Sequence, residues 1–122
     1  MSGYILVVDD DRDIRDSLVE LLTDRGYPAV GAGNGVEALE ILRTSASPPS
    51  LILLDLMMPV MDGREFRERQ LENPAWSEIP VIVISAYSDV EQQARALALD
   101  HLRKPLAIRP LIDAIRRHCT DA

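Results

Sequence analysis

The feature that most constrains the fold is a series of short apolar runs that alternate with amphipathic segments along the chain. The runs are rich in leucine and β-branched residues, and each is far shorter than the ~20 residues needed to cross a bilayer. They therefore read as buried strands. We predict five strands, at residues 4–8, 28–32, 51–54, 81–84 and 101–103.

Between these runs, apolar residues recur at helical spacing. The first predicted helix buries Ile14, Leu18, Leu21 and Leu22. A second helix follows Asn34 and Gly35, with an expected apolar face of Val36, Leu39, Ile41 and Leu42. Three more helices are expected at residues 64–72, 90–99 and 108–119, the last with a buried stripe of Leu111, Ile112 and Ile115.

Strictly alternating strands and helices indicate an α/β protein, and 122 residues fit one domain over residues 1–122. Right-handed crossovers of this length bring each strand back parallel to the one before. We therefore predict a doubly wound, flavodoxin-like sheet of five parallel strands in the order 2-1-3-4-5, with helices on both faces. In such a fold the site lies at the carboxyl ends of strands 1 and 3, where the winding reverses.

The charge balance excludes several classes of partner. The chain has 20 acidic residues against 13 Lys and Arg, a formal net charge of -7, which repels nucleic acid and anionic membrane surfaces. The single cysteine, Cys119, cannot form an internal disulfide, and the start of the chain lacks the pattern of a signal peptide. We expect a cytoplasmic domain that binds neither nucleic acid nor membrane.

Polar residues follow four of the five predicted strands. Asp9 and Asp10 follow the first, Asp55 the third, Ser85 the fourth and Lys104 the fifth. The carboxyl ends of parallel strands share one edge of the sheet, so these side chains should lie close together. Three carboxylates at one point repel each other unless a hard cation such as Mg²⁺ lies between them. The sequence therefore predicts a magnesium site.

The other two polar groups suit phosphoryl transfer to a carboxylate. Lys104 supplies a fixed positive charge and Ser85 a hydroxyl donor for phosphoryl oxygens. Asp55 is a nucleophile of the kind that forms an acyl phosphate. Taken singly, the signals have plainer explanations, such as a helix N-cap for Asp11 or a solvated turn lysine for Lys104. Only the joint pattern favours phosphoryl transfer.

Four runs resemble the signature blocks of response-regulator receiver domains of two-component systems, including those of single-domain chemotaxis regulators. In order and at the family's spacing, they are ILVVDDD (5–11), LILLDLMMPVMDG (51–63), VIVISA (81–86) and HLRKPL (101–106). The resemblance covers essentially the whole chain. It implies that Asp55 is the phosphoacceptor and that Asp9, Asp10, Asp55 and the backbone carbonyl of Met57 hold Mg²⁺. It also implies that Ser85 is the switch hydroxyl and that Lys104 contacts the phosphoryl group.

The same resemblance implies partners. The phosphoryl donor would be a sensor histidine kinase or a histidine phosphotransfer protein, and the output a protein contact or a dimer linked to phosphorylation. The chain would be a phosphoacceptor that assists its own phosphorylation and dephosphorylation, and no enzyme beyond that. Its output face would comprise the helix at 90–99, the fifth strand and the last helix, where Arg95, Arg109, Arg116 and Arg117 would meet an acidic partner.

The sequence departs from the family at His101, where the family usually has Tyr or Phe. Two roles are therefore possible for His101: an imidazole exposed at the surface, or a ring that turns inward on phosphorylation.

Two other functions fit the sequence less well. Phosphatases of the haloacid-dehalogenase kind carry a second Asp two residues after the nucleophile, and here that position is Met57. A flavin or nucleotide binder would need a phosphate-cradling loop after the first strand, where this chain has three aspartates. A stand-alone receiver, or phosphorelay intermediate, is the organisation expected, with a fragment of a larger transcription regulator as the alternative.

Overall fold

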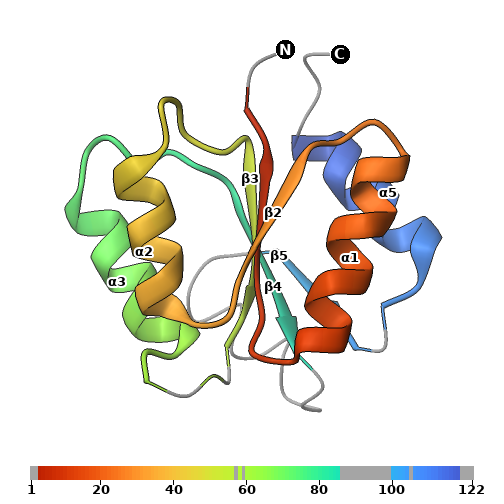
Figure 1. The fold of residues 1–122 in the computed structure, drawn as a ribbon, viewed down its shortest axis with the longest axis horizontal. Coiled ribbons are helices and arrows are strands. Elements are labelled where there is room, and N and C mark those ends of the chain that lie inside the picture. Colours follow the sequence, from red (N-terminus) through yellow and green to blue (C-terminus); the bar gives the residue numbers. More distant parts are fainter. Residues whose placement is uncertain (1–2, 57, 59, 86–99, 105, 119–122) are drawn as a thin grey trace.

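A parallel sheet of five strands forms the centre of the protein (Figure 1). The computed structural model describes residues 3–56, 58, 60–85, 100–104 and 106–118. The strand order is β2-β1-β3-β4-β5, which confirms the predicted order and the doubly wound α/β fold. The strands are β1 (Ile5–Val8), β2 (Ala29–Ala32), β3 (Leu51–Asp55), β4 (Val81–Ser85) and β5 (Asp100–Arg103).

Helices cover both faces of the sheet, α1 and α5 on one face and α2 and α3 on the other (Figure 1). Their bounds are α1 (Arg12–Asp24), α2 (Gly35–Thr44), α3 (Gly63–Glu72) and α5 (Ile108–His118). Side-chain oxygens of Asp11, Asn34 and Asp62 cap α1, α2 and α3 by accepting first-turn N–H groups. The helix predicted at residues 90–99 lies outside the described residues. None of the described helices is long and apolar enough to span a membrane.

The strand residues alternate between two hydrophobic clusters, one on each face of the sheet. Ile5 and Val7 of β1 pack toward α1 and α5, whereas Leu6 and Val8 pack toward α2 and α3. Both faces are buried, so the strands read as continuous apolar runs in the sequence. The predicted stripe of α5, Leu111, Ile112 and Ile115, is buried as expected.

The predicted apolar face of α2 was wrong at Val36, whose side chain is 48% exposed. The buried residues of this helix are Gly35, Ala38 and Leu42, spaced by three and four positions along one side. Successive helical residues are rotated by about 100°, which turns Val36 away from that side. A glycine and an alanine face the interior because α2 packs closely there: a Cβ added at Gly35 would lie 2.6 Å from Met61 Cγ.

The register of the sheet brings the polar strand ends to one edge. Val8 of β1 pairs with Leu54 of β3, so the residues that follow, Asp9 and Asp55, occupy neighbouring positions. Ser85 at the end of β4 pairs with Arg103 of β5, directly before Lys104. The carboxyl ends of four strands therefore deliver their polar residues side by side.

Candidate functional site

Three carboxylates meet at the carboxyl edge of the sheet. Asp9, Asp10 and Asp55 each bring one carboxylate oxygen to within 4.8 Å of the other two. Asp9 and Asp55 are buried, with 0% and 5% of their surface exposed, whereas Asp10 is exposed. In the strand alternation both buried aspartates belong to the face that α1 and α5 cover. The structure thus brings together the three acids that the sequence placed at the strand ends.

The ammonium group of Lys104 lies between two of these carboxylates. Its Nζ is 2.7 Å from Asp9 Oδ2 and 3.3 Å from Asp55 Oδ2. The backbone N–H of Lys104 donates to the carbonyl of Ser85 at 2.8 Å, which extends the β4–β5 pairing by one residue. This bond fixes the point from which the lysine side chain reaches into the acid cluster.

Two opposing effects act on the pKa of Lys104. Burial of the ammonium lowers it, but the close contact with Asp9 and the negative charges of Asp55 and Asp9 together outweigh burial. The net result is a raised pKa, because the charged form gains more from its two neighbours than it loses in hydration. Lys104 therefore stays positively charged in the cluster at neutral pH.

The donor set of the cluster fits a magnesium ion. Asp9 Oδ1 accepts a hydrogen bond from the backbone N–H of Asp11 at 2.9 Å. Asp9 Oδ2 is buried and faces the Lys104 ammonium at 2.7 Å. Each carboxylate oxygen can still bind a further ligand, and the exposed Asp10 leaves the cluster open to water. The three acids therefore offer the oxygen ligands and the water access that a hard, partly hydrated cation requires.

A glycine supports the end of β3. The N–H of Gly63, the first residue of α3, donates to the carbonyl of Leu56 at 3.0 Å. A Cβ added at Gly63 would lie 2.6 Å from the carbonyl oxygen of Asp55 and 2.7 Å from Leu56 Cα. Both contacts are to backbone atoms that cannot move aside cheaply. Gly63 is therefore required for the close approach of α3 to Asp55.

An arginine supports the end of β1. Arg15 Nη1 donates to the backbone carbonyl of Asp9 at 3.0 Å, and its side chain is only 20% exposed. It runs beside β2, where a Cβ added at Gly31 would lie 2.9 Å from Arg15 Cγ. The sequence analysis did not single out Arg15 or Gly63. One sequence signal pointed to a contact of this kind: Gly31 lies inside a predicted strand, and a glycine there often marks a place where another group packs closely against the backbone.

The remaining predicted site residues have the following places. Ser85 is fully buried at the end of β4. Asp11 caps α1 by accepting from the N–H groups of Asp13 and Ile14, so the plainer explanation is correct for this one aspartate. Met57 lies outside the described residues. His101 is exposed on β5.

A comparison with protein families identifies the family to which this chain belongs. The model of the response regulator receiver domain matches residues 5–116. The chain belongs to the response-regulator receiver domain family. Receiver domains take phosphoryl groups from histidine kinases and bind Mg²⁺ at an acidic cluster.

Individual relatives agree with the family. Response regulator MprA of Mycobacterium ulcerans is 40% identical over 119 residues, which is 95% of this chain and 50% of MprA. The chain thus spans about half the length of the curated relatives that it matches.

Among solved structures, the N-terminal domain of a response regulator receiver protein from Methanoculleus marisnigri is 37% identical, with a TM-score of 0.76 and full coverage of both chains. Response regulator TrrA from Thermotoga maritima, solved in complex with Mg²⁺-BeF, is 28% identical, with a TM-score of 0.81 and coverage of 95% and 98%.

Proposed function

We propose that this receiver domain is a phosphorylation switch in which Asp55 accepts the phosphoryl group of a phosphohistidine. The donor is a sensor histidine kinase or a histidine phosphotransfer protein. The observation that carries the proposal is the cluster of Asp9, Asp10 and Asp55 with the Lys104 ammonium 3.3 Å from Asp55 Oδ2. This arrangement supports the proposal, because the Asp55 carboxylate lies beside two carboxylates that could hold a cation and beside a fixed positive charge.

The transfer needs little beyond these groups. A carboxylate oxygen of Asp55 forms a bond to phosphorus while the phosphorus–nitrogen bond of the phosphohistidine breaks, and the released imidazole retains or takes up a proton. The Lys104 ammonium offsets the negative charge on the phosphoryl oxygens, and the Ser85 hydroxyl donates to one of them. The product is an acyl phosphate on Asp55.

Mg²⁺ would be held by Asp9, Asp10 and Asp55, together with the backbone carbonyl of Met57 that the family resemblance assigns. When bound, the ion neutralises charge on the phosphoryl oxygens and orients them. The three carboxylate oxygens of Asp9, Asp10 and Asp55, which lie within 4.8 Å of one another, support this site. The Mg²⁺-BeF complex of the relative TrrA supports it independently.

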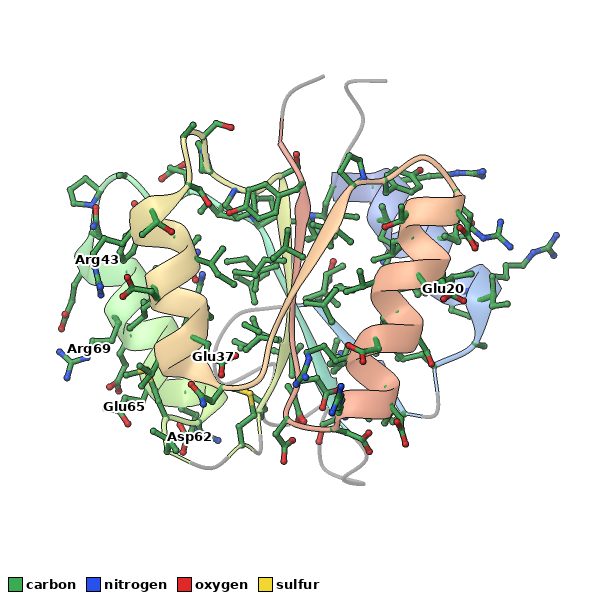
Figure 2. All side chains as sticks on the ribbon, in the orientation of Figure 1. Glu20, Glu37, Arg43, Asp62, Glu65 and Arg69 are labelled. Atoms are coloured by element: carbon green, nitrogen blue, oxygen red, sulfur yellow. The ribbon has the colours of Figure 1, made fainter. Side chains whose placement is uncertain are left out.

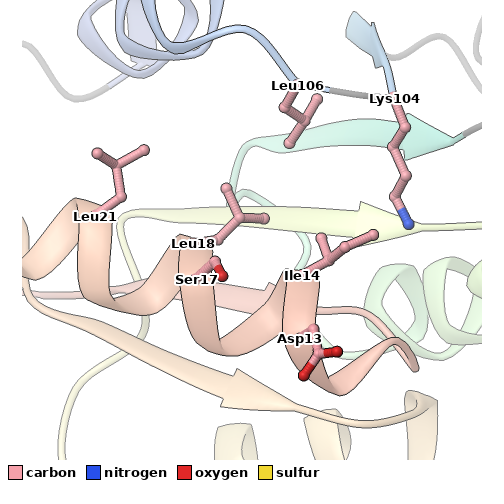
Figure 3. Close-up of a pocket in the computed structure, with 7 residues that line it drawn as sticks. All are labelled: Asp13, Ile14, Ser17, Leu18, Leu21, Lys104 and Leu106. Carbon is pink, nitrogen blue, oxygen red and sulfur yellow. The ribbon is translucent and has the colours of Figure 1, made fainter.

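A groove beside the acid cluster offers a place for the donor protein. It has a volume of about 350 Å³ and lies between α1 and the segment that follows β5 (Figure 3). Lys104 lines both the groove and the cluster, so a donor docked here would have its imidazole near Asp55. The remaining walls are mostly apolar and are formed by Asp13, Ile14, Ser17, Leu18, Leu21 and Leu106. We propose that a helix of the phosphodonor packs along α1 in this groove.

Acetyl phosphate tests phosphate acceptance without any docking partner. With Mg²⁺, intact-mass spectrometry should show one added phosphoryl group per chain, and Asp55→Asn should add none. Asp62→Asn is the matched control, because asparagine still caps α3 and the same charge is lost nearby. Phosphorylation of Asp55→Asn at an undiminished rate would refute the assignment.

The docking groove is tested separately. Ile14→Ser should slow transfer from a phosphorylated histidine phosphotransfer protein while leaving the rate with acetyl phosphate unchanged. Equal slowing with both donors would mean that Ile14 supports the acid cluster and not docking. Phosphorylation is further proposed to change the face that β5 and α5 present to an output protein.

A further inference from the structure

A second groove lies between the end of α1 and α5, two helices that cover the same face of the sheet (Figure 1). Its volume is about 360 Å³. Arg25, the C-cap of α1, forms one side, and Arg109 and Arg116 of α5 lie on the other. α1 begins beside the acid cluster and Arg25 follows its last residue, so the groove lies a helix length, about 20 Å, from that site.

These three arginines have no ion-pair partner among the described residues. Other arginines of the protein do pair with carboxylates, namely Arg12, Arg15, Arg43 and Arg69. The groove itself contains one acidic residue, Asp113, against three positive charges. A locally cationic groove on a chain of net charge -7 attracts an acidic partner and orients it.

The groove also has an apolar component. Ile108 is 51% exposed at its rim, and Ile112, 6% exposed, forms part of its wall. A bare phosphate would leave this apolar surface uncovered, whereas a peptide segment can place a side chain on it. A nucleic-acid backbone, like a bare phosphate, has no apolar side chain to place on this surface. The features together favour a protein ligand in which carboxylates flank an apolar residue.

We propose that the groove of Arg25, Arg109 and Arg116 docks an acidic segment of a partner protein that carries an apolar residue among its carboxylates. The surface shares Arg109 and Arg116 with the output face expected from the family resemblance, but it faces α1, not β5, and is completed by Arg25. It does not depend on phosphate acceptance at Asp55, so each proposal can fail alone.

A synthetic peptide of repeating Glu and Leu, labelled with fluorescein, is a direct probe, and a Gln and Leu peptide of equal length is its control. Fluorescence anisotropy with the 122-residue chain should detect binding of the Glu peptide only. Binding should weaken as salt rises from about 0.05 to 0.3 M, because exposed charges are screened. The double variant Arg25→Gln/Arg109→Gln should bind about tenfold more weakly.

The matched control is Arg43→Gln/Arg69→Gln, which removes the same charge from α2 and α3 on the opposite face (Figure 2). It should bind the Glu peptide like the parent chain. Both double variants should melt at the parent temperature and accept a phosphoryl group from acetyl phosphate at the parent rate.

Four results would overturn the proposal. Equal loss of binding in both double variants would mean that only net charge matters, and equal binding of the Gln peptide would mean that only apolar contact matters. A duplex DNA that displaces the Glu peptide at lower concentration than unlabelled Glu peptide would assign the groove to nucleic acid. Self-association in sedimentation that Arg25→Gln/Arg109→Gln abolishes would assign it to a second copy of the chain.

Discussion

The Nζ atom of Lys104 lies 2.7 Å from Asp9 Oδ2, although the strands that lead to these residues, β5 and β1, are separated in the sheet by β3 and β4. The Lys104 side chain therefore reaches across the carboxyl ends of the intervening strands (Figure 3), while its backbone stays hydrogen-bonded to Ser85 at the end of β4. The contact gives the acid cluster a cation of its own. Lys104 is the only lysine of the chain, which makes both the residue and its amine easy to test.

Lys104→Met should destabilise the protein in EDTA by about 3 kcal/mol, because it leaves the buried Asp9 carboxylate without its positive neighbour. Mg²⁺ at millimolar concentration should recover much of this loss. Urea unfolding with and without Mg²⁺ measures both effects, and Lys104→Arg, which keeps the charge, should lose less. A methionine variant as stable as the parent in EDTA would show that the contact contributes nothing.

The raised pKa of Lys104 predicts the pH dependence of the metal-free protein. The unfolded chain loses the lysine proton near pH ~10.4, before the folded chain does. The stabilising contribution is therefore complete below ~10.4 and is lost as pH rises through the higher folded pKa. Reductive methylation with ¹³C-formaldehyde labels only Lys104 and the chain terminus, so NMR can follow this titration. A folded midpoint at or below that of the urea-unfolded chain would contradict the prediction.

The strand ends of the site could be predicted from the sequence, because the physics there is local. Short apolar runs predict the strands. In a parallel sheet the residues that end the strands lie at one edge, so Asp9, Asp55 and Ser85 are expected there regardless of how the loops are built. The start of α2 was predicted to within one residue: the helix was expected after Asn34 and Gly35, and it begins at Gly35 with Asn34 as its N-cap. These features depend on the periodicity of apolar residues and on single residue types, and both can be recognised in the amino-acid sequence.

Contacts made by long side chains could not be predicted in this way. The positions of Lys104 over Asp9 and of Arg15 against the Asp9 carbonyl depend on the paths of loops and on space left by glycine. Val36 was misplaced because the buried side of α2 uses Gly35 and Ala38, whose small side chains contribute little to a hydrophobic pattern. The arginine groove requires knowledge of which helices are neighbours.

Mg²⁺ should stabilise the fold, because it binds the native cluster and not the unfolded chain. Asp10 is exposed and forms no ion pair with any described residue, so Asp10→Asn should leave the EDTA melting temperature unchanged or slightly higher while reducing the Mg²⁺-induced rise. Asp24→Asn, at the far end of α1, is the control and should keep the full rise. Thermal melts indifferent to Mg²⁺ in the parent chain would argue against the metal site.

Arg15→Ala should weaken Mg²⁺ binding about tenfold, since Arg15 orients Asp9 through its backbone without touching the ion. The ¹³C-methyl signal of Lys104 can report the titration directly. Arg12→Ala removes an exposed arginine from the same turn of α1 and should bind Mg²⁺ like the parent. If both variants lose affinity equally, the effect of Arg15 is one of net charge and not of positioning.

The most direct test of the central claim is to locate the phosphoryl group itself. An acyl phosphate of aspartate is reduced by borohydride to homoserine, so treatment of the chain with acetyl phosphate and Mg²⁺, followed by borohydride and peptide mass spectrometry, marks the acceptor permanently. We predict homoserine at position 55 alone, dependent on both acetyl phosphate and Mg²⁺. Homoserine at position 9 or 10, or none at position 55 in a chain that has gained the mass of a phosphoryl group, would contradict the account.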